Sequence, residues 1–203
     1  MNSPAWTVEH QVRSAEELKE LARRLAANLR AGDLLVLSGE LGAGKTTFTQ
    51  GLGTGLGVRA GIISPTFVLV RQHPNLGDGP GLVHVDAYRL ESAAEIDDLD
   101  LEATLDTSIT VIEWGAGRVE HLTASRLDVT ITRPVGGGLV PGATALAAGG
   151  GLAPEAGGLA PMGGFAPEVP MTFDDDADEL RHVSITAYGP RWSAGQPASL
   201  LLD

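Results

Sequence analysis

The first part of the chain changes from a two-residue hydrophobic period to a helical one and back. Residues 6–12 alternate between apolar and polar positions, which predicts a strand. Over 14–29 the leucines and alanines recur at helical spacing and form one apolar face, and Ser14 with Glu17 has the spacing of a capping box. The short apolar run 34–38 is typical of a buried strand. The pattern therefore predicts a strand, a helix and a strand in this order.

Further along, the pattern predicts one more long helix, a short acidic helix and a series of strands. The long helix covers 46–56, lacks proline and is closed by the glycines within 53–57. A second capping-box spacing, Ser92 with Glu95, opens the short helix. β-Branched and apolar runs predict the strands 68–70, 82–85, 109–112, 127–132 and 182–188. Together these helices and strands favour an α/β fold.

Residues 134–173 break this pattern. They are rich in glycine, alanine and proline, show no periodicity, and are followed by an acidic run. Such a composition buries too little apolar surface to offset the entropy of ordering the chain. We interpret 134–180 as a flexible insertion in a hairpin, with a binding or regulatory tail as the alternative. The predicted organisation is one main domain of 1–133 with 181–190, this insertion, and a loosely attached tail at 191–203.

The composition narrows the class of protein. A chain of 203 residues suits one domain with an appendage. Cysteine is absent, so disulfides and thiolate metal sites are excluded. No apolar run reaches the ~18 residues of a membrane span, and the N-terminus lacks the pattern of a signal peptide. We therefore expect a cytoplasmic protein that does not bind membranes.

The net charge of −12 is unevenly distributed. Seven acidic residues and no lysine or arginine fall within 134–180, and the rest of the chain is mildly acidic without a basic stripe. Proteins that bind DNA or RNA on their own carry clustered positive charge. The charge pattern therefore argues against direct binding of DNA or RNA.

The most specific motif is the stretch 39–46, GELGAGKT, which fits the phosphate-loop pattern G-x-x-x-x-G-K-[ST] between a predicted strand and a predicted helix. A helix start offers unpaired N–H groups and the positive end of the helix dipole. The glycines let the backbone curl around a phosphate. Lys45 adds a positive charge near the β- and γ-phosphates, and Thr46 offers a hydroxyl to Mg²⁺. The motif predicts nucleotide binding.

Two acidic residues that end predicted strands could complete this site. Asp86, in the segment HVDAYR, would face the crevice where open α/β sheets bind ligands. It could hold a metal-bound water or orient an attacking one. Glu113, after the apolar run TVI, has the position of a Walker-B acid that holds Mg²⁺ directly or through water, although the usual residue is Asp.

Three neighbouring residues each have two interpretations. Thr66, in SPTF, could reach a γ-phosphate or Mg²⁺ from a switch-like loop, or bond locally in a proline turn. Arg89 could bind a phosphate, but pairing with Glu91 is favoured. Trp114 could stack on a base or a partner, but packing alone is favoured. No N-K-x-D guanine motif occurs, so adenine is the favoured base.

Together these segments resemble one family, the bacterial TsaE proteins, which are the ATPase subunits of the machinery that makes threonylcarbamoyladenosine in tRNA. The order and spacing of the motifs match from about 6 to 133 and again from about 181 to 190. The combination is specific, although each short motif alone is not. The matching segments are 39–47 (GELGAGKTT), 64–67 (SPTF), 84–90 (HVDAYRL), 95–101 (EIDDLDL) and 111–115 (VIEWG).

The resemblance implies an α/β fold of the P-loop NTPase type. This is a three-layer sandwich with a mostly parallel central sheet and an antiparallel hairpin, which here would carry the disordered insertion. The resemblance also implies ATP and Mg²⁺ as ligands, and partners similar to TsaB and TsaD. A TsaD-like partner would transfer the threonylcarbamoyl group to tRNA. The chain itself would be a weak, partner-dependent ATPase that keeps the complex turning over and meets tRNA only indirectly.

Carried over to this sequence, the resemblance assigns catalytic roles to Lys45, Asp86 and Glu113, with Asp86 near the γ-phosphate. Thr46 and Glu113 would serve Mg²⁺, and Trp114 would support the nucleotide site or the partner surface. The adenine would lie against the start of the first helix, at Ala15. The expected nucleotide-binding set is Gly39, Leu41, Gly42, Ala43, Gly44, Lys45, Thr46, Thr47, Thr66, Asp86, Trp114 and Ala15.

Two other functions remain open. A P-loop small-molecule kinase would need a lid with arginines, and the longest insertion has none. A non-catalytic interaction module would change its affinity for a partner with nucleotide and without turnover. The insertion 134–180 departs from the family's pattern, and no arginine finger has a clear placement in the sequence.

Overall fold

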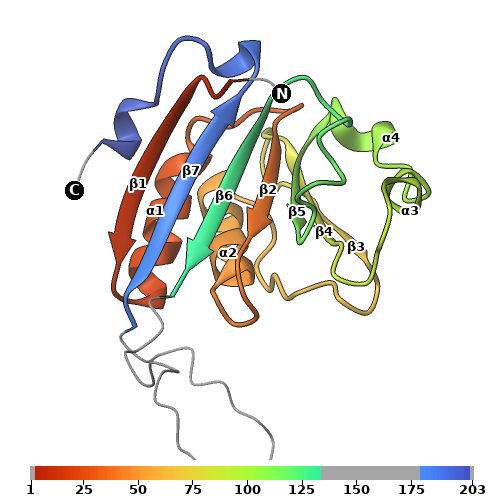
Figure 1. Ribbon diagram of the computed structural model, residues 1–203. Helices are drawn as coiled ribbons and strands as arrows, with labels where there is room; N and C mark the ends of the chain where they lie inside the picture. The colour runs from red at the N-terminus through yellow and green to blue at the C-terminus, as the bar shows by residue number, and fades with distance from the viewer. Residues whose placement is uncertain (1–2, 134–178, 202–203) are drawn as a thin grey trace, which may run out of the picture. The chain divides into compact units, whose positions relative to one another are not determined.

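The computed structural model describes residues 3–133 and 179–201 (Figure 1). The expected insertion lies outside the described residues apart from its last two positions. Within the described part of the chain, no helix combines the length and the hydrophobicity that crossing a bilayer requires. The elements are β1 (Trp6–Val12), α1 (Ala15–Ala26), β2 (Leu34–Ser38), α2 (Lys45–Leu56), β3 (Val70–His73), β4 (Gly81–Asp86), α3 (Ala93–Asp97), α4 (Glu102–Leu105), β5 (Ser108–Glu113), β6 (Arg126–Thr132), β7 (Arg181–Tyr188) and the 3-10 helices η1 (Pro190–Trp192) and η2 (Ala198–Leu200).

Seven strands form one mixed sheet in the order β1-β7-β6-β2-β5-β4-β3. In its centre, β2 runs parallel to β5 and β6, and β5 runs parallel to β4. The outer pairs β1–β7, β6–β7 and β3–β4 are antiparallel. The parallel centre confirms the expected α/β sheet, but the antiparallel part is larger than one hairpin.

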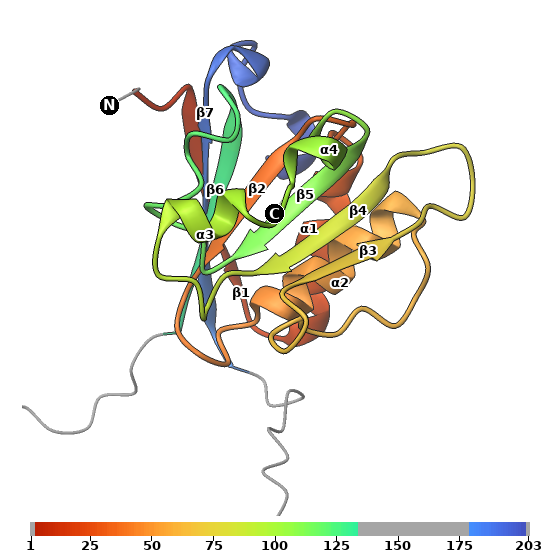
Figure 2. The ribbon, with the colours of Figure 1, turned by 90° about the vertical axis from the view of Figure 1, so that its right-hand side faces the viewer.

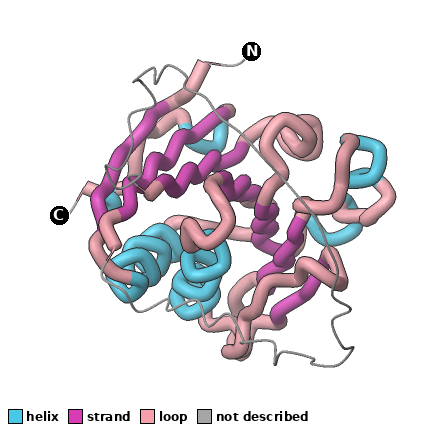
Figure 3. Tube along the Cα trace, turned by 60° about the horizontal axis from the view of Figure 1, so that its bottom comes forward, coloured by secondary structure: helices cyan, strands magenta, loops and turns pink. Residues whose placement is uncertain are grey.

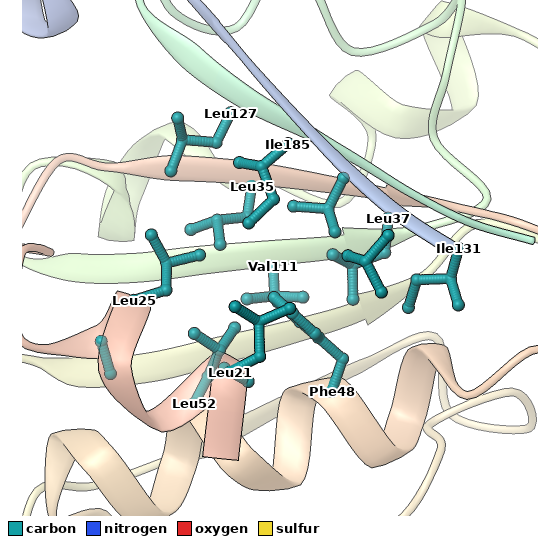
Figure 4. Close-up of a cluster of buried hydrophobic side chains, with 14 of the residues drawn as sticks. Leu21, Leu25, Leu35, Leu37, Phe48, Leu52, Val111, Leu127, Ile131 and Ile185 are labelled. Atoms are coloured by element: carbon teal, nitrogen blue, oxygen red, sulfur yellow. The ribbon is translucent and has the colours of Figure 1, made fainter. Parts of the chain in front are cut away.

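The helices α1 and α2 cover one face of the sheet (Figure 3). The predicted apolar stripe of α1 is buried and packs with Phe48 of α2 and with strand residues in the main core (Figure 4). The two helices approach closely at Gly51, where a Cβ would lie 2.3 Å from the carbonyl oxygen of Lys19. Glycine lowers the helix propensity of α2, but here it allows α1 to pack against the backbone.

The opposite face is covered over only part of its width in the described residues, so the expected three-layer sandwich is incomplete. Over β2, β5 and β4, a second apolar cluster includes Ile96 of α3 and Val119, and α3 lies on the other side of the sheet from α2 (Figure 2). Over β1, β7 and β6, outward residues such as Thr7, Thr130 and His182 are exposed. The sequence explains this difference, because four of the five residues of β2 are apolar and β5 is buried along 109–113, whereas apolar and polar residues alternate along β1 and β6.

The two predicted capping boxes differ in the structure. The box at the start of α3 is complete, with reciprocal hydrogen bonds between Ser92 and Glu95. At the start of α1, Ser14 Oγ accepts the N–H of Glu17 at 3.1 Å. The Glu17 carboxylate, however, accepts the N–H of Arg13 at 2.7 Å and not that of Ser14. Ser14 and Ser92 therefore each cap a helix, but at α1 the glutamate of the predicted box bonds to the N–H of Arg13 instead of Ser14.

The predicted end of the second helix is confirmed, and one predicted strand boundary is wrong. The helix α2 ends at Leu56, as expected, and Gly57 follows it as the C-cap with a left-handed φ of 73°. The glycines inside α2 face close neighbours, as Gly55 does with α1. The strand β3 begins at Val70 and not at 68, because Leu69 has a left-handed φ of 63°. A backbone in that region does not continue a strand.

The segment after β7 packs against the main core, so the loose attachment expected for 191–203 is wrong for its described part. Trp192 is buried, and the ring of Trp6 meets it edge-on with centroids 5.9 Å apart. The Trp6 indole N–H donates to the Trp192 carbonyl at 3.1 Å. Arg191 forms an ion pair with buried Asp33 at 3.1 Å. The proline and glycine residues that suggested a loose tail are therefore compatible with a packed segment.

Candidate nucleotide site

The candidate site lies at the carboxyl ends of the central parallel strands. The strand β2 leads into the phosphate loop, β4 ends at Asp86 and β5 ends at Glu113. Asp86 and Glu113 are register partners, and Leu37 of β2 pairs with Glu113. Because these strands are parallel, their carboxyl ends meet at one edge of the sheet, where open α/β sheets bind ligands. The topology therefore joins three segments that are far apart in the sequence.

The phosphate loop presents the start of α2 without a side-chain cap. Gly44 is the N-cap residue, with a left-handed φ of 109°, and a Cβ there would lie 2.6 Å from Leu18 Cδ2. The first N–H groups of a helix have no intrahelical acceptor, so they and the helix dipole are available to an anion. The predicted loop residues lie together in this turn and the first helical positions: Gly39, Leu41, Gly42, Ala43, Gly44, Lys45, Thr46 and Thr47.

Lys45 turns back towards its own loop. Its Nζ donates to the carbonyl oxygens of Gly39 at 2.8 Å and Glu40 at 2.9 Å, and lies 3.7 Å from the centroid of the Trp114 ring. Burial lowers the pKa of the Lys45 ammonium, while the two strand-end carboxylates favour its charged form. A positive charge is therefore held among carbonyls, an aromatic face and two acids beside the loop.

Trp114 reaches this position through an unusual backbone conformation. Its φ is 63°, which is uncommon for a large residue and often marks a functional site. Its N–H donates to the Leu37 carbonyl at 3.0 Å. Its ring contacts Tyr88, with centroids 5.3 Å apart, as well as the Lys45 ammonium. Packing alone, the favoured interpretation of this tryptophan, does not account for its contact with the phosphate-loop lysine.

Glu113 connects the phosphate loop to β4. Its Oε1 accepts hydrogen bonds from the Thr46 hydroxyl at 3.0 Å and from His84 Nε2 at 2.8 Å. The Glu113 and His84 side chains are 4% and 0% exposed. The sequence placed Thr46 and Glu113 together as metal ligands, and the structure brings them into contact. The sequence alone assigned no role to His84.

Asp86 connects the SPTF segment to the site. Its Oδ2 accepts from the Ser64 hydroxyl at 2.9 Å and from the Thr66 hydroxyl at 2.5 Å. Its Oδ1 accepts from the backbone N–H of Tyr88 at 3.0 Å. Thr66 thus bonds to the strand-end acid and also locally, since its hydroxyl lies 2.7 Å from that of Ser64. Contact between Thr66 and a γ-phosphate or Mg²⁺ stays a prediction.

The oxygen donors at this edge suit a Mg²⁺ ion. Thr46 and Glu113 supply a hydroxyl and a carboxylate, and Mg²⁺ is usually bound by one or two carboxylates together with substrate phosphates and water. No group of three or more His, Cys, Asp and Glu side chains in residues 3–133 and 179–201 could hold a metal by itself. The donor set fits an ion whose other ligands come from a nucleotide.

Sequence reasoning missed two arginines beside the loop. Arg133, directly after β6, donates to the Leu41 carbonyl at 3.2 Å. Its Nη1 lies 3.7 Å from the point that a Cβ on Gly42 would occupy. Arg181, at the start of β7, is 5% exposed, and its Nε lies 3.7 Å from the corresponding point at Gly44. The antiparallel pairing of β6 with β7 carries both residues to the edge with the phosphate loop.

Two other predictions concern residues around the site. The Arg89 guanidinium lies 5.0 Å from the centroid of the Phe67 ring. Among the described residues it forms no salt bridge, so the favoured pairing with Glu91 is wrong. Ala15 begins α1, a helix that reaches the phosphate loop through Leu18. Contact between Ala15 and a nucleotide base stays a prediction.

Comparison with known sequences agrees with these features. Residues 12–136 match the family model described as threonylcarbamoyl adenosine biosynthesis protein TsaE. The chain is 48% identical over 184 residues to the tRNA threonylcarbamoyladenosine biosynthesis protein TsaE of Streptomyces coelicolor, covering 90% of this chain and 99% of that protein. It is 42% identical over 119 residues to the protein of the same name from Bacillus subtilis, covering 58% of this chain and 73% of that protein.

A solved structure shows the same fold. The crystal structure of YdiB from Bacillus subtilis superposes with a TM-score of 0.58 and 27% sequence identity, covering 93% of this chain and 90% of that one. The mixed α/β sheet described above is therefore shared with an experimentally determined structure.

Proposed function

Because this chain belongs to the TsaE family of threonylcarbamoyl adenosine biosynthesis proteins, we propose that it binds and hydrolyses ATP in the service of tRNA threonylcarbamoyladenosine synthesis. The observation that carries the proposal is the hydrogen bond from the Thr46 hydroxyl to Glu113 Oε1, at 3.0 Å. In P-loop NTPases the loop Ser or Thr and the Walker-B acid together hold Mg²⁺. One hydrogen bond thus joins the two parts that such a site needs.

Phosphate binding would be the task of the loop. The backbone N–H groups at the start of α2 would donate to the phosphate oxygens, and the helix dipole would add to their attraction. Lys45 would exchange its bonds with the Gly39 and Glu40 carbonyls for bonds with the β- and γ-phosphates. Arg133 and Arg181 lie close to Gly42 and Gly44 and would add positive charge there.

The Thr46 hydroxyl and the Glu113 carboxylate would hold the metal. Thr46 donates its only hydroxyl hydrogen to Glu113, which leaves its lone pairs free to bind a cation. Glu113 would hold a water of the metal's shell, as a Walker-B acid does. When bound, Mg²⁺ would neutralise charge that develops on the phosphates during transfer.

Asp86 would orient the water that attacks the γ-phosphate in line. Three hydrogen bonds, from Ser64, Thr66 and the backbone of Tyr88, fix the direction of its carboxylate. Positioning and electrostatic stabilisation together account for most of the rate enhancement in phosphoryl transfer. A γ-phosphate would compete with Asp86 for the Thr66 hydroxyl, so the SPTF segment would respond to its presence.

We place this activity in a cytoplasmic complex with TsaB- and TsaD-like partners. The threonylcarbamoyl transfer would occur on the TsaD-like partner, and this chain would meet tRNA only through the complex. Large apolar side chains are exposed on the segment next to Asp86, with Phe67 at 85% and Ile63 and Val68 at 56%. Contiguous exposed apolar patches mark protein-binding surfaces, and we propose that this segment contributes to one.

The test is phosphate release from ATP, measured with the protein alone and with a TsaB–TsaD pair, using Lys45→Ala as the inactive control. We expect weak release that the pair increases. Transfer to a small-molecule acceptor without free phosphate would favour the kinase and overturn the proposal. Tight ATP binding without release under any condition would favour the non-catalytic module instead.

A further inference from the structure

His84 is the one fully buried histidine among the described residues, and its contact with Glu113 gives it a role beyond packing. It lies on β4 opposite Val111, two residues before the register partner of Glu113. This places its ring diagonally across from the acid, with Nε2 at 2.8 Å from Oε1. We propose that His84 is a positioning residue, which fixes the Glu113 carboxylate for metal binding. The inference rests on the proposed Mg²⁺-dependent function.

Two donors from different elements hold the same oxygen of Glu113. Thr46, from the start of α2, and His84, from β4, both bond to Oε1. None of the hydrogen bonds formed within residues 3–133 and 179–201 ends on Oε2. The carboxylate is therefore anchored at one oxygen, and the other oxygen remains available to water of a metal shell. Hydrogen bonds to a ligating carboxylate orient it, and their loss weakens metal binding.

The chemistry of the pair also determines which nitrogen of His84 carries hydrogen. The Glu113 carboxylate only accepts hydrogen bonds, so Nε2 donates. The other nitrogen, Nδ1, is buried and has no hydrogen-bond partner among the described residues. A buried polar atom without a partner costs stability, and an apolar residue would fill this position without that cost. Packing alone therefore does not account for a histidine here.

Glutamine and asparagine separate the two nitrogens experimentally. The amide nitrogen of Gln can reach the place of Nε2, whereas that of Asn reaches only the place of Nδ1. The surface pair His121–Asp97 has a similar distance, 2.7 Å, but lies in solvent with side chains 46% and 58% exposed. His121→Asn is therefore a matched control for the loss of a His–carboxylate contact.

The first experiment measures Mg²⁺ affinity by calorimetry, in the presence of a non-hydrolysable ATP analogue, for the full chain and its variants. We expect His84→Asn to weaken Mg²⁺ binding about tenfold. His84→Gln should stay within about threefold of the parent, and His121→Asn should be unchanged. Affinity for the analogue without Mg²⁺ should be the same in all four proteins. Equal Mg²⁺ affinity of the Asn and Gln variants would overturn the proposal.

The second experiment uses only the parent protein, so it does not depend on whether a His84 variant folds. Nitrogen-15 NMR of the metal-free parent protein should show the His84 imidazole as the Nε2–H tautomer, with its proton protected from exchange. The Nδ1–H tautomer would overturn the proposal. If the parent protein bound neither ATP nor Mg²⁺, the proposed function would be wrong, even if the tautomer were as expected. If the parent binds both and the Gln and Asn variants behave alike, the role of His84 alone is wrong.

Discussion

The two halves of the sheet differ in what covers them and in what they contribute. Along β2, β5 and β4 nearly every residue is buried, whereas buried and exposed positions alternate along β1, β7 and β6. The first half is parallel and ends in the phosphate loop, Asp86 and Glu113. The second half is largely antiparallel, and one of its faces is open in the described residues.

Strand direction explains why the chemistry gathers in one half. Parallel strands bring all their carboxyl ends to the same edge, so each can add a residue to one site. In an antiparallel pair only one strand ends at a given edge, while the other begins there. The second half therefore contributes Arg133 from the end of β6 and Arg181 from the start of β7. We expect variants in the parallel half to change nucleotide chemistry, and variants in the other half to change mainly stability.

The largest expected effect lies in the antiparallel half. Trp192→Ala should lower the free energy of unfolding by about 3–5 kcal/mol, because it removes a buried aromatic ring that contacts Trp6. Nucleotide affinity of the folded variant should stay within about twofold, since the ring lies away from the phosphate loop. Urea unfolding and calorimetry with ATP measure the two quantities.

The control is Leu201→Ala, at a residue 55% exposed, which should change stability by less than about 0.5 kcal/mol. A large loss of affinity in folded Trp192→Ala would show that the halves are not separable.

Glu113→Gln should show the opposite pattern. It keeps the shape of the side chain but removes the charge that we propose serves Mg²⁺, so we expect kcat for ATP hydrolysis to fall about 100-fold. ATP affinity without Mg²⁺ should stay within about threefold, and the melting temperature should not fall. Steady-state phosphate release and thermal melts give both values. A variant that hydrolyses ATP normally would contradict the metal role of Glu113.

Lys45→Ala should act on binding more than on folding. A hydrogen bond to a charged group contributes about 1.5–3 kcal/mol, so ATP affinity should fall roughly 10- to 100-fold. The chain's other lysine, Lys19, forms an exposed pair with Glu16 on α1, and Lys19→Ala should leave affinity unchanged. Calorimetry on both variants makes the comparison. Equal affinities would exclude Lys45 from the nucleotide site.

Arg133→Ala tests whether the antiparallel half contributes to the site at all. Arg133 follows the carboxyl end of β6 beside the loop, and Arg126 begins the same strand at the far end, where it pairs with Asp128. Arg133 is partly exposed, so its removal should weaken ATP binding only about three- to fivefold. Arg126→Ala should not weaken it. If the two variants behaved alike, nearness of Arg133 to the loop would have no functional meaning.

The parts of the site that follow one strand each were predictable from the sequence. The phosphate loop, Asp86 and Glu113 come directly after apolar runs, so their position along the chain already places them at a strand end. Because the parallel strands are buried on both faces, these runs are mostly apolar, with His84 and Thr110 as polar exceptions. The contact between Thr46 and Glu113 followed from the motif's known chemistry.

The parts that depend on pairing between distant strands were not predictable in the same way. Arg133 and Arg181 look like surface residues of a hairpin until the register shows which edge they reach. His84 meets Glu113 only because β4 pairs with β5 in the observed register. The position of the Trp114 ring depends on a left-handed backbone that the local sequence does not demand. The anchoring of Trp192 requires a partner in β1, which is 186 residues away.

The smallest expected effect concerns the open face of β6. Asp128 lies there with its side chain 30% exposed, paired with Arg126 at 2.9 Å. Burial raises the pKa of the Asp128 carboxyl, while the bond with Arg126 acts in the opposite direction. A raised pKa means that the folded state favours the protonated acid, so the charged form slightly destabilises the fold at neutral pH. That penalty grows as the pH rises from the unfolded-state pKa to the folded-state pKa, is complete above the folded-state pKa, and is absent below the unfolded-state pKa.

Asp128→Asn should therefore raise the melting temperature at pH 7, by about 1 °C for a change of a few tenths of a kcal/mol. The gain should shrink as the pH is lowered, because the aspartate of the parent protein becomes protonated. Thermal melts of both proteins between pH 4 and 8 measure the difference, with ATP affinity as the control, which should not change. A lower melting temperature at pH 7 would mean that the ion pair with Arg126 outweighs burial. The open half of the sheet would then derive stability from its polar face, as the buried half does from its apolar one.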